Sequence, residues 1–181
     1  MAACGSTNVE VKIMDPASPE YVFAAQLVEH VMQRKFIFQL DERFRVRQDM
    51  RLFPEKTRRY VGYFLNKFSL ELYFGFAKCF ESKAIHNFNF EQFVAKLKET
   101  SRSVRSKGDL LRFATCLSYY AELAVIRGAC NAPYISLRCI YDVVVEYINS
   151  GKQGASNFLN DMEEASKELL EDFIIDKKFI F

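Results

Sequence analysis

The sequence predicts an all-α fold, in which amphipathic helices surround one central apolar helix. Apolar residues recur at spacings of three and four along nearly the whole chain, which is the period of an α-helix. Only four prolines and seven glycines interrupt the 181 residues, so few breaks are expected. Half of the residues are hydrophobic, which is enough to bury one sizeable core.

One folded domain is expected. Residues 1–17 are predicted to be a flexible N-terminus, residues 18–175 a single helical domain, and residues 176–181 a C-terminal tail. Residues 35–55 are expected to form a long loop between the first and second helices, because Pro54 and a high density of charge disfavour a core helix there.

The first helix is predicted to begin at Ser18, which can cap it, with Pro19 in the first turn. One buried face is predicted, formed by Tyr21, Ala25, Val28 and Met32. The second helix is expected from about Lys56 to about Phe80. Its apolar residues spread beyond a single stripe, so it should meet the core on one side and another surface on the other.

The third helix is predicted near Asn89, which can cap it, with Gln92 in the position of a capping-box partner. The fourth helix can be capped by either Ser106 or Asp109. It is apolar all round to about Ile126, as expected of a central helix.

The fifth helix is predicted to begin near Pro133, with Asn131 as its cap, and to stop at Ser150 and Gly151. The last helix, SNFLNDMEEASKELLEDF (156–173), is amphipathic and acidic. Its carboxylates alternate with apolar residues, which is typical of a solvated helix face rather than of a catalytic pair.

Composition and motifs disfavour several classes of function. Lys and Arg exceed Asp and Glu by only 25 to 23, so no strong overall field would attract nucleic acid. His30 and His86 lie far apart, without ligands at metal-binding spacing, and neither a metal nor another cofactor is predicted. No phosphate-binding glycine loop or nucleophile elbow occurs, so we do not expect an enzyme.

Cysteine usage and hydropathy predict a cytoplasmic protein. The five cysteines include no C-x-x-C pair, and free thiols in a reducing compartment are expected. No basic and apolar leader is found at the start of the chain, and no apolar run reaches the ~18 residues of a membrane span. We therefore expect no stable membrane anchor.

Arg112 is a charged residue near the start of the apolar stretch DLLRFATCLSYYAELAVIRGA (109–129). A guanidinium among apolar side chains needs a partner. Asp109, three residues earlier on the same helix face, can supply one, and this ion pair is the favoured interpretation. In the other interpretation, Arg112 lies at the rim of an apolar groove and receives an acid from a ligand.

Three segments carry a resemblance to a known family. VGYFLNKFSLELYFGFAKC (61–79) is similar to a third homology helix, Leu-x-x-x-Gly-Asp-x-Phe, and NFEQFVAKL (89–97) to a Phe-Glu-x-Val-x-x-Glu-Leu segment. DLLRFATCLSYYAEL (109–123) is similar to an Asn-Trp-Gly-Arg-hydrophobic run and places Arg112 on the motif arginine. On these segments, residues 19–160 resemble the B-cell lymphoma-2 family of apoptosis regulators.

The chain departs from the family pattern at several positions. Leu65 and Asn66 replace the Gly-Asp pair, and Asp109-Leu110-Leu111 replace Asn-Trp-Gly. In the family, the Gly-Asp pair lets that helix dock into another member's groove, so its loss argues against a ligand or an executioner role. Such divergence without a C-terminal anchor is similar to that of virus-encoded members.

The resemblance implies a pro-survival protein that holds the amphipathic death-ligand helix of pro-apoptotic partners in a surface hydrophobic groove. The implied groove residues are Phe68, Leu72, Gly75, Phe76 and Cys79 on one wall, Phe93 and Leu97 on the other, Thr115 and Tyr119 on the floor, and Arg112 with Asp109 at the rim. The charge of Asp109 near the ligand's aspartate predicts a narrower or weaker choice of ligands, unless Asp109 pairs with Arg112.

Three other functions stay open. The first is a helical adaptor whose groove does not function, and which binds signalling proteins or self-associates through exposed phenylalanines. The second is an executioner that permeabilises membranes, and the third is an enzyme. Recruitment to mitochondria through partners and formation of a homodimer are both compatible with the sequence, which does not choose the ligand.

Overall fold

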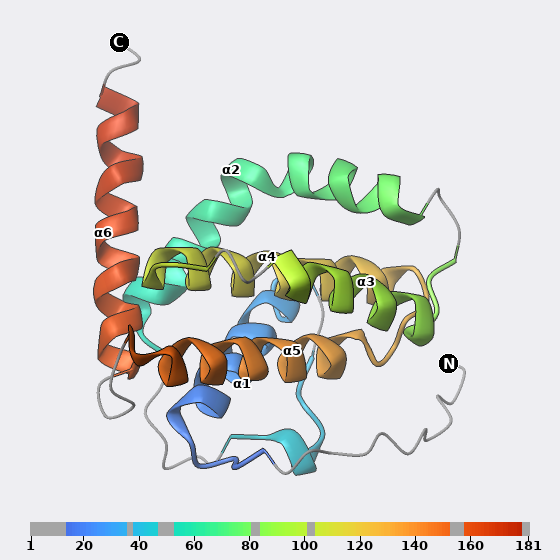
Figure 1. Ribbon diagram of the computed structural model, residues 1–181. Coiled ribbons are helices and arrows are strands. Elements are labelled where there is room, and N and C mark those ends of the chain that lie inside the picture. Colours follow the sequence, from blue (N-terminus) through green and yellow to red (C-terminus); the bar gives the residue numbers. More distant parts are fainter. Residues whose placement is uncertain are drawn as a thin grey trace.

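The computed structural model shows an all-helical bundle (Figure 1), which confirms that the fold is all-α. It describes residues 14–35, 38–46, 53–80, 84–100, 104–152 and 158–178. Within these ranges no strand occurs, and six α-helices are found: α1 (Pro19–Met32), α2 (Glu55–Phe80), α3 (Asn87–Thr100), α4 (Lys107–Ile126), α5 (Ala132–Tyr147) and α6 (Phe158–Lys178). A short 3-10 helix (Glu42–Phe44) lies between α1 and α2, and a π-helical turn (Ile148–Lys152) follows α5.

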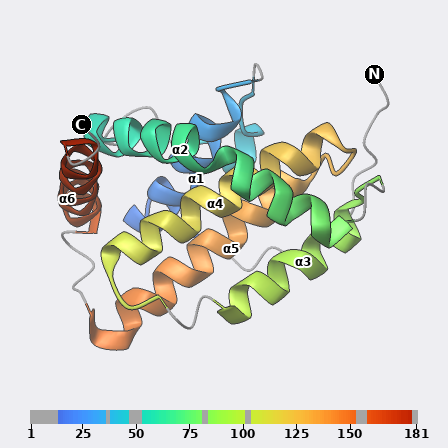
Figure 2. The ribbon, with the colours of Figure 1, turned by 90° about the horizontal axis from the view of Figure 1, so that it is seen from above.

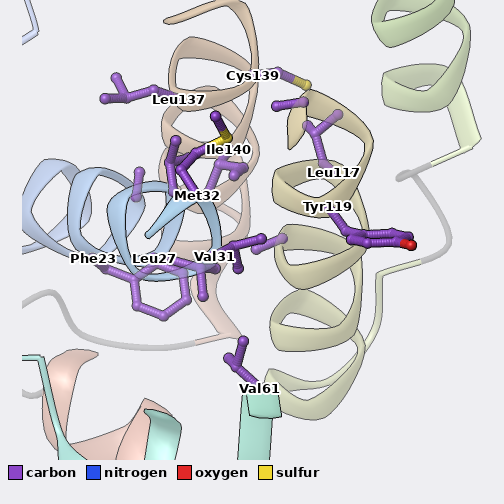
Figure 3. Packing of buried hydrophobic residues seen from close by; sticks show 14 of the residues in the cluster. Phe23, Leu27, Val31, Met32, Val61, Leu117, Tyr119, Leu137, Cys139 and Ile140 are labelled. Atoms are coloured by element: carbon purple, nitrogen blue, oxygen red, sulfur yellow. The ribbon is translucent and has the colours of Figure 1, made fainter. Parts of the chain in front are cut away.

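Helix α1 begins where the sequence predicts, because Ser18 caps it. The backbone N–H of Tyr21 donates to Ser18 Oγ at 3.2 Å. More of α1 is buried than the single face that the sequence predicts. Phe23 and Leu27 lie outside that face and are also fully buried. The reason is that α1 packs against α4 and α5 and also contacts α6. Figure 3 shows side chains of α1 among those of its neighbours.

Helix α4 packs against α1, α2, α5 and α6, and more than half of its residues are buried. One of them is the charged residue Glu122, which is 1% exposed. Its Oε1 lies 3.0 Å from Nζ of Lys35, which follows the end of α1. A carboxylate removed from water needs a compensating charge, so this ion pair fixes the end of α1 against α4.

The turn between α4 and α5 holds the segment that leads into α3. Gly128 has a φ of +108°, and a Cβ there would lie 3.3 Å from the carbonyl oxygen of Ile85. The N–H of Ile85 donates to the Arg127 carbonyl at 2.9 Å, and the N–H of Asn131 donates to Asn87 Oδ1 at 2.9 Å. These bonds fix the start of α3 at the α4–α5 turn.

Helix α3 begins at Asn87, two residues before the cap that the sequence predicts. Asn89 is therefore inside the first turn. Its Oδ1 accepts a hydrogen bond from the backbone N–H of His86 at 2.7 Å. The side chain satisfies the backbone at the helix start from inside the helix, which is the role that a capping box gives to the third helical residue.

Helix α6 packs against α2 and α4. Ser166 Oγ donates to Thr57 Oγ1 at 3.0 Å in the core, and Lys107 Nζ lies 2.9 Å from Asp161 Oδ1. The helix continues to Lys178, into the segment predicted as a tail, and residues 179–181 lie outside the described ranges. None of the described helices, α6 included, combines the length and hydropathy needed to cross a membrane.

The cysteines differ in state. Cys79, Cys116 and Cys139 carry free thiols, as predicted, and burial raises the pKa of the Cys116 and Cys139 thiols to about 12. Cys130, by contrast, is disulfide-bonded, which corrects the prediction of free thiols throughout. It lies in the turn between α4 and α5, where it is only partly covered, and not in the apolar core.

Stability is expected to decrease as the pH is lowered through the range below 6.5, because of His30. Burial, followed by the charges of Arg58 and Arg34, lowers the pKa of His30 from its ordinary value of 6.5. Between the two pKa values the unfolded chain binds more protons than the folded chain, so the free energy of unfolding rises with pH. Urea unfolding of the wild type and His30→Gln from pH 7.5 to 5.0 checks this: an equal pH dependence in both proteins would contradict it.

Candidate functional site: a pocket between three helices

An open pocket with a volume of about 500 Å³ lies where α2, α4 and α6 meet. Figure 2 shows that α2 crosses above α4. Residues 66–75 of α2 include no buried residue, whereas α2 is packed into the core on either side of this stretch. The pocket is lined by Phe64, Lys67, Phe68, Glu71 and Leu72 of α2, Arg112 and Tyr120 of α4, and Leu169 and Asp172 of α6.

The walls of this pocket are apolar, and its charged groups are of both signs. The rings of Phe64 and Phe68 lie against each other, with centroids 5.0 Å apart. Two basic and two acidic side chains share the lining with them. Apolar walls with a few charged groups suit an amphipathic polypeptide segment, whose apolar face enters while its polar groups meet the rim.

Arg112 pairs with Asp109 and also lines the pocket. Its Nη1 lies 3.6 Å from Asp109 Oδ1, and its side chain is 49% exposed. The same side chain lines the pocket. Burial raises the pKa of the Tyr60 phenol, and the charge and hydrogen bond of Arg112 partly offset this rise. The ion pair with Asp109 is long and solvated, so it holds Arg112 only weakly.

The main hydrogen bonds of Asp109 are those that cap the start of α4. Ser106 is the capping residue: its Oγ accepts from the Asp109 N–H at 3.0 Å. Asp109 Oδ2 in turn accepts from the Ser106 N–H at 3.1 Å and from the Ser106 hydroxyl at 2.8 Å. Burial alone would raise the pKa of Asp109, but these bonds, the Arg105 N–H and the Arg112 charge together lower it. The two predicted caps therefore act as one reciprocal capping box.

Replacing Ser106 by alanine is expected to lower the free energy of unfolding by about 1 kcal/mol, because the Asp109 N–H loses its acceptor. Chemical unfolding at neutral pH measures this, with Gln92→Ala, at an exposed position on α3, as the comparison. An unchanged stability of Ser106→Ala would show that the capping box contributes nothing.

Aromatic rings fill the space between α2 and α3, where the sequence predicts a groove. Phe76 is 1% exposed, and its ring stacks on Tyr120 with centroids 5.5 Å apart and planes at 16°. It also meets the Phe93 ring edge-on at 5.6 Å, and Phe80 packs against both Phe76 and Phe93. Phe76 and Phe93 therefore pack against each other as part of the core. The open pocket lies elsewhere, between α2, α4 and α6, and includes Arg112.

The other predicted groove residues separate into two groups. Phe68, Leu72 and Arg112 come together at the pocket, with Asp109 beside Arg112. Those outside the lining are Gly75 and Cys79, exposed on α2, the half-buried Leu97 on α3, and the buried Thr115 and Tyr119 on α4.

Thr115 and Tyr119 are both buried, and α2 covers Tyr119. The Thr115 hydroxyl donates to the Leu111 carbonyl within α4 at 2.7 Å, and Thr115 has no exposed surface. Tyr119 lies under α2, where its hydroxyl donates to the Ser69 carbonyl at 3.4 Å. The next residue, Tyr120, lines the pocket in place of the predicted floor residues.

Sequence reasoning missed the contribution of α6 to the pocket. Leu169 and Asp172 close one side of it. The amphipathic spacing of Met162, Ala165 and Leu169 predicts a buried face, and all three are buried. The spacing does not indicate which helices this face covers, so no local signal placed Leu169 or Asp172 beside Arg112.

Comparisons with protein-family models, with curated proteins and with solved structures found no match for this chain. Across the part of the chain that the structure describes, no group of three or more His, Cys, Asp or Glu side chains is placed to hold a metal ion.

Proposed function

We propose that this chain is a pro-survival inhibitor of apoptosis that sequesters the amphipathic death-ligand helix of pro-apoptotic partners in the pocket between α2, α4 and α6. One observation carries the proposal: Arg112 is half exposed and lines the same pocket as the apolar side chains of Phe68 and Leu72. The resemblance of 61–79, 89–97 and 109–123 to the B-cell lymphoma-2 family adds support.

Helix-in-groove recognition needs apolar anchors and a charge that sets the register. Phe68, Leu72 and Leu169 offer surface to the apolar face of a ligand helix. An aspartate of the ligand meets Arg112. Once the ligand covers this ion pair, solvent screens the attraction less than it does in the free protein.

The capping box makes Arg112 available for this role. Asp109 keeps its hydrogen bonds with Ser106 and with the Arg105 N–H when Arg112 turns away from it. The Asp109 carboxylate is therefore not left without partners. Little free energy is lost when Arg112 leaves Asp109 and pairs with an aspartate of the ligand. Asp109 still places a negative charge near the incoming aspartate, so we expect a narrow choice of ligands.

The aromatic cluster of Phe76, Phe80, Phe93 and Tyr120 also limits which ligand helices can bind. A ligand helix that reaches along α2 toward Phe76 meets rings that already fill the space between α2 and α3. Ligands with their strongest anchors near Arg112 are therefore expected to bind best, since the others must displace packed side chains.

The test is protection of isolated mitochondria that are exposed to a pro-apoptotic protein. The wild-type chain is expected to block release of intermembrane-space proteins, and Leu72→Glu, which places an acid in the pocket, is expected to lose the protection. Phe88→Glu is the matched control, because Phe88 is 70% exposed on α3 and does not line the pocket. Protection by Leu72→Glu equal to that of the wild type would contradict the proposal and favour the adaptor.

A further inference from the structure

The outer side of α2 exposes large apolar side chains that the pocket does not use. Leu70 is 65% exposed, Phe74 57% and Tyr73 46%, and none of them lines the pocket. The rings of Tyr73 and Phe74 lie edge to face, with centroids 5.8 Å apart. In Figure 2, none of the helices that the structure describes lies over this part of α2. A contiguous exposed apolar patch of this kind marks an interaction surface.

Two charges flank the patch in a self-complementary arrangement. Glu71 and Lys78 are both exposed and are seven residues apart, so they lie on the same flank of the helix, with Phe74 between them. Within the described residues neither has an ion-pair partner. An antiparallel helix with the same sequence would bring its lysine to Glu71 and its glutamate to Lys78.

We propose that this face of α2 binds a second copy of the chain, with the two α2 helices antiparallel and a two-fold axis midway between Glu71 and Lys78. Phe74 then meets Phe74 of the second copy at the axis. Leu70 packs beside the last turn of the opposite α2. Such a contact is isologous and closes as a dimer, because each copy offers the same patch.

The size of the patch sets the strength of the contact. From Leu70 to Cys79 the helix rises only about 14 Å, and fewer residues take part than the 20 to 30 a side of a standard stable interface. We therefore expect a weak dimer that dissociates in about the micromolar range and becomes dominant at higher concentrations. The contact shares Glu71 with the pocket lining but leaves Phe68 and Arg112 outside it, so formation of the dimer does not require that the pocket binds a ligand.

Sedimentation equilibrium of the purified chain over a wide concentration range tests the existence of the dimer. The wild type is expected to pass from monomer to dimer, and Leu70→Glu to stay monomeric. Ile126→Glu, at a residue that is 55% exposed at the end of α4, is expected to dimerise like the wild type. A wild type that stays monomeric at hundreds of micromolar, or a dimer that survives Leu70→Glu, would overturn the proposal.

Charge reversal tests the antiparallel arrangement. In Glu71→Lys, lysines at positions 71 and 78 face each other across the dimer, and in Lys78→Glu, glutamates do. The like charges repel, so each variant alone is expected to dimerise roughly tenfold more weakly or worse. Mixing the two variants restores opposite charges in both pairs, and a heterodimer is expected to form as readily as the wild-type dimer. If the mixture associates no better than the separate variants, the antiparallel pairing is wrong.

Discussion

Replacing Arg112 by alanine is expected to weaken binding of a death-ligand helix by roughly 2 to 5 kcal/mol, or about 30- to 4,000-fold. Most of this loss arises because the ligand's carboxylate is then covered without a partner. The folded protein itself should change little, because the pair with Asp109 is long and solvated and contributes at most about 1 kcal/mol. Fluorescence anisotropy with a labelled peptide measures the affinity, and chemical unfolding measures the stability.

Two further variants separate the local role of Arg112 from a general effect of charge. Arg59→Ala removes the same charge from an exposed position on α2 outside the pocket, and it is expected to leave the affinity within about twofold of the wild type. Arg112→Lys keeps the charge but loses the planar guanidinium, whose N–H groups can donate two hydrogen bonds to one carboxylate. We expect its affinity to lie between those of the wild type and Arg112→Ala. Equal losses in Arg59→Ala and Arg112→Ala would show that Arg112 acts only through the net charge.

Replacing Phe76 by alanine is expected to lower the free energy of unfolding by about 3 to 5 kcal/mol. The Phe76 ring is buried against Tyr120, Phe93 and Phe80, and its removal leaves a cavity at the contact of α2 with α3 and α4. Urea unfolding measures the loss. It should be made at a low protein concentration, so that association through the exposed face of α2 does not contribute.

Phe74→Ala is the matched control for this measurement. Phe74 is 57% exposed on the same helix, two residues earlier, and its truncation is expected to change stability by less than about 0.5 kcal/mol. A small loss in Phe76→Ala, similar to that in Phe74→Ala, would mean that the aromatic cluster between α2 and α3 is not a packed part of the core.

Much of the fold could be predicted because its signals are local. Ser18 with Pro19 marks the start of α1, and the continuous apolar pattern after Ser106 marks α4. The start of α3 differs from the prediction because long-range hydrogen bonds fix it, including the bond from the Asn131 N–H to Asn87 Oδ1. These bonds form only when the α4–α5 turn is in place, so the sequence near residue 89 carries no sign of them.

The pocket could be predicted only in part. Phe68, Leu72 and Arg112 follow from motif positions on α2 and α4 and do line it. The floor residue depends on where α2 crosses α4, which covers Tyr119 and leaves Tyr120 in the lining. The contribution of Leu169 depends on tertiary packing of α6, which amphipathic spacing indicates without naming the partner.

Calorimetric titration of the purified chain with a panel of death-ligand helix peptides tests whether the pocket binds such helices. We expect tight binding of one or a few peptides, with a negative heat-capacity change from burial of apolar surface, and loss of binding in Leu72→Glu. Absence of binding by every peptide would contradict it. Arg112 would then serve only as the partner of Asp109, and the pocket would not be a site for death ligands.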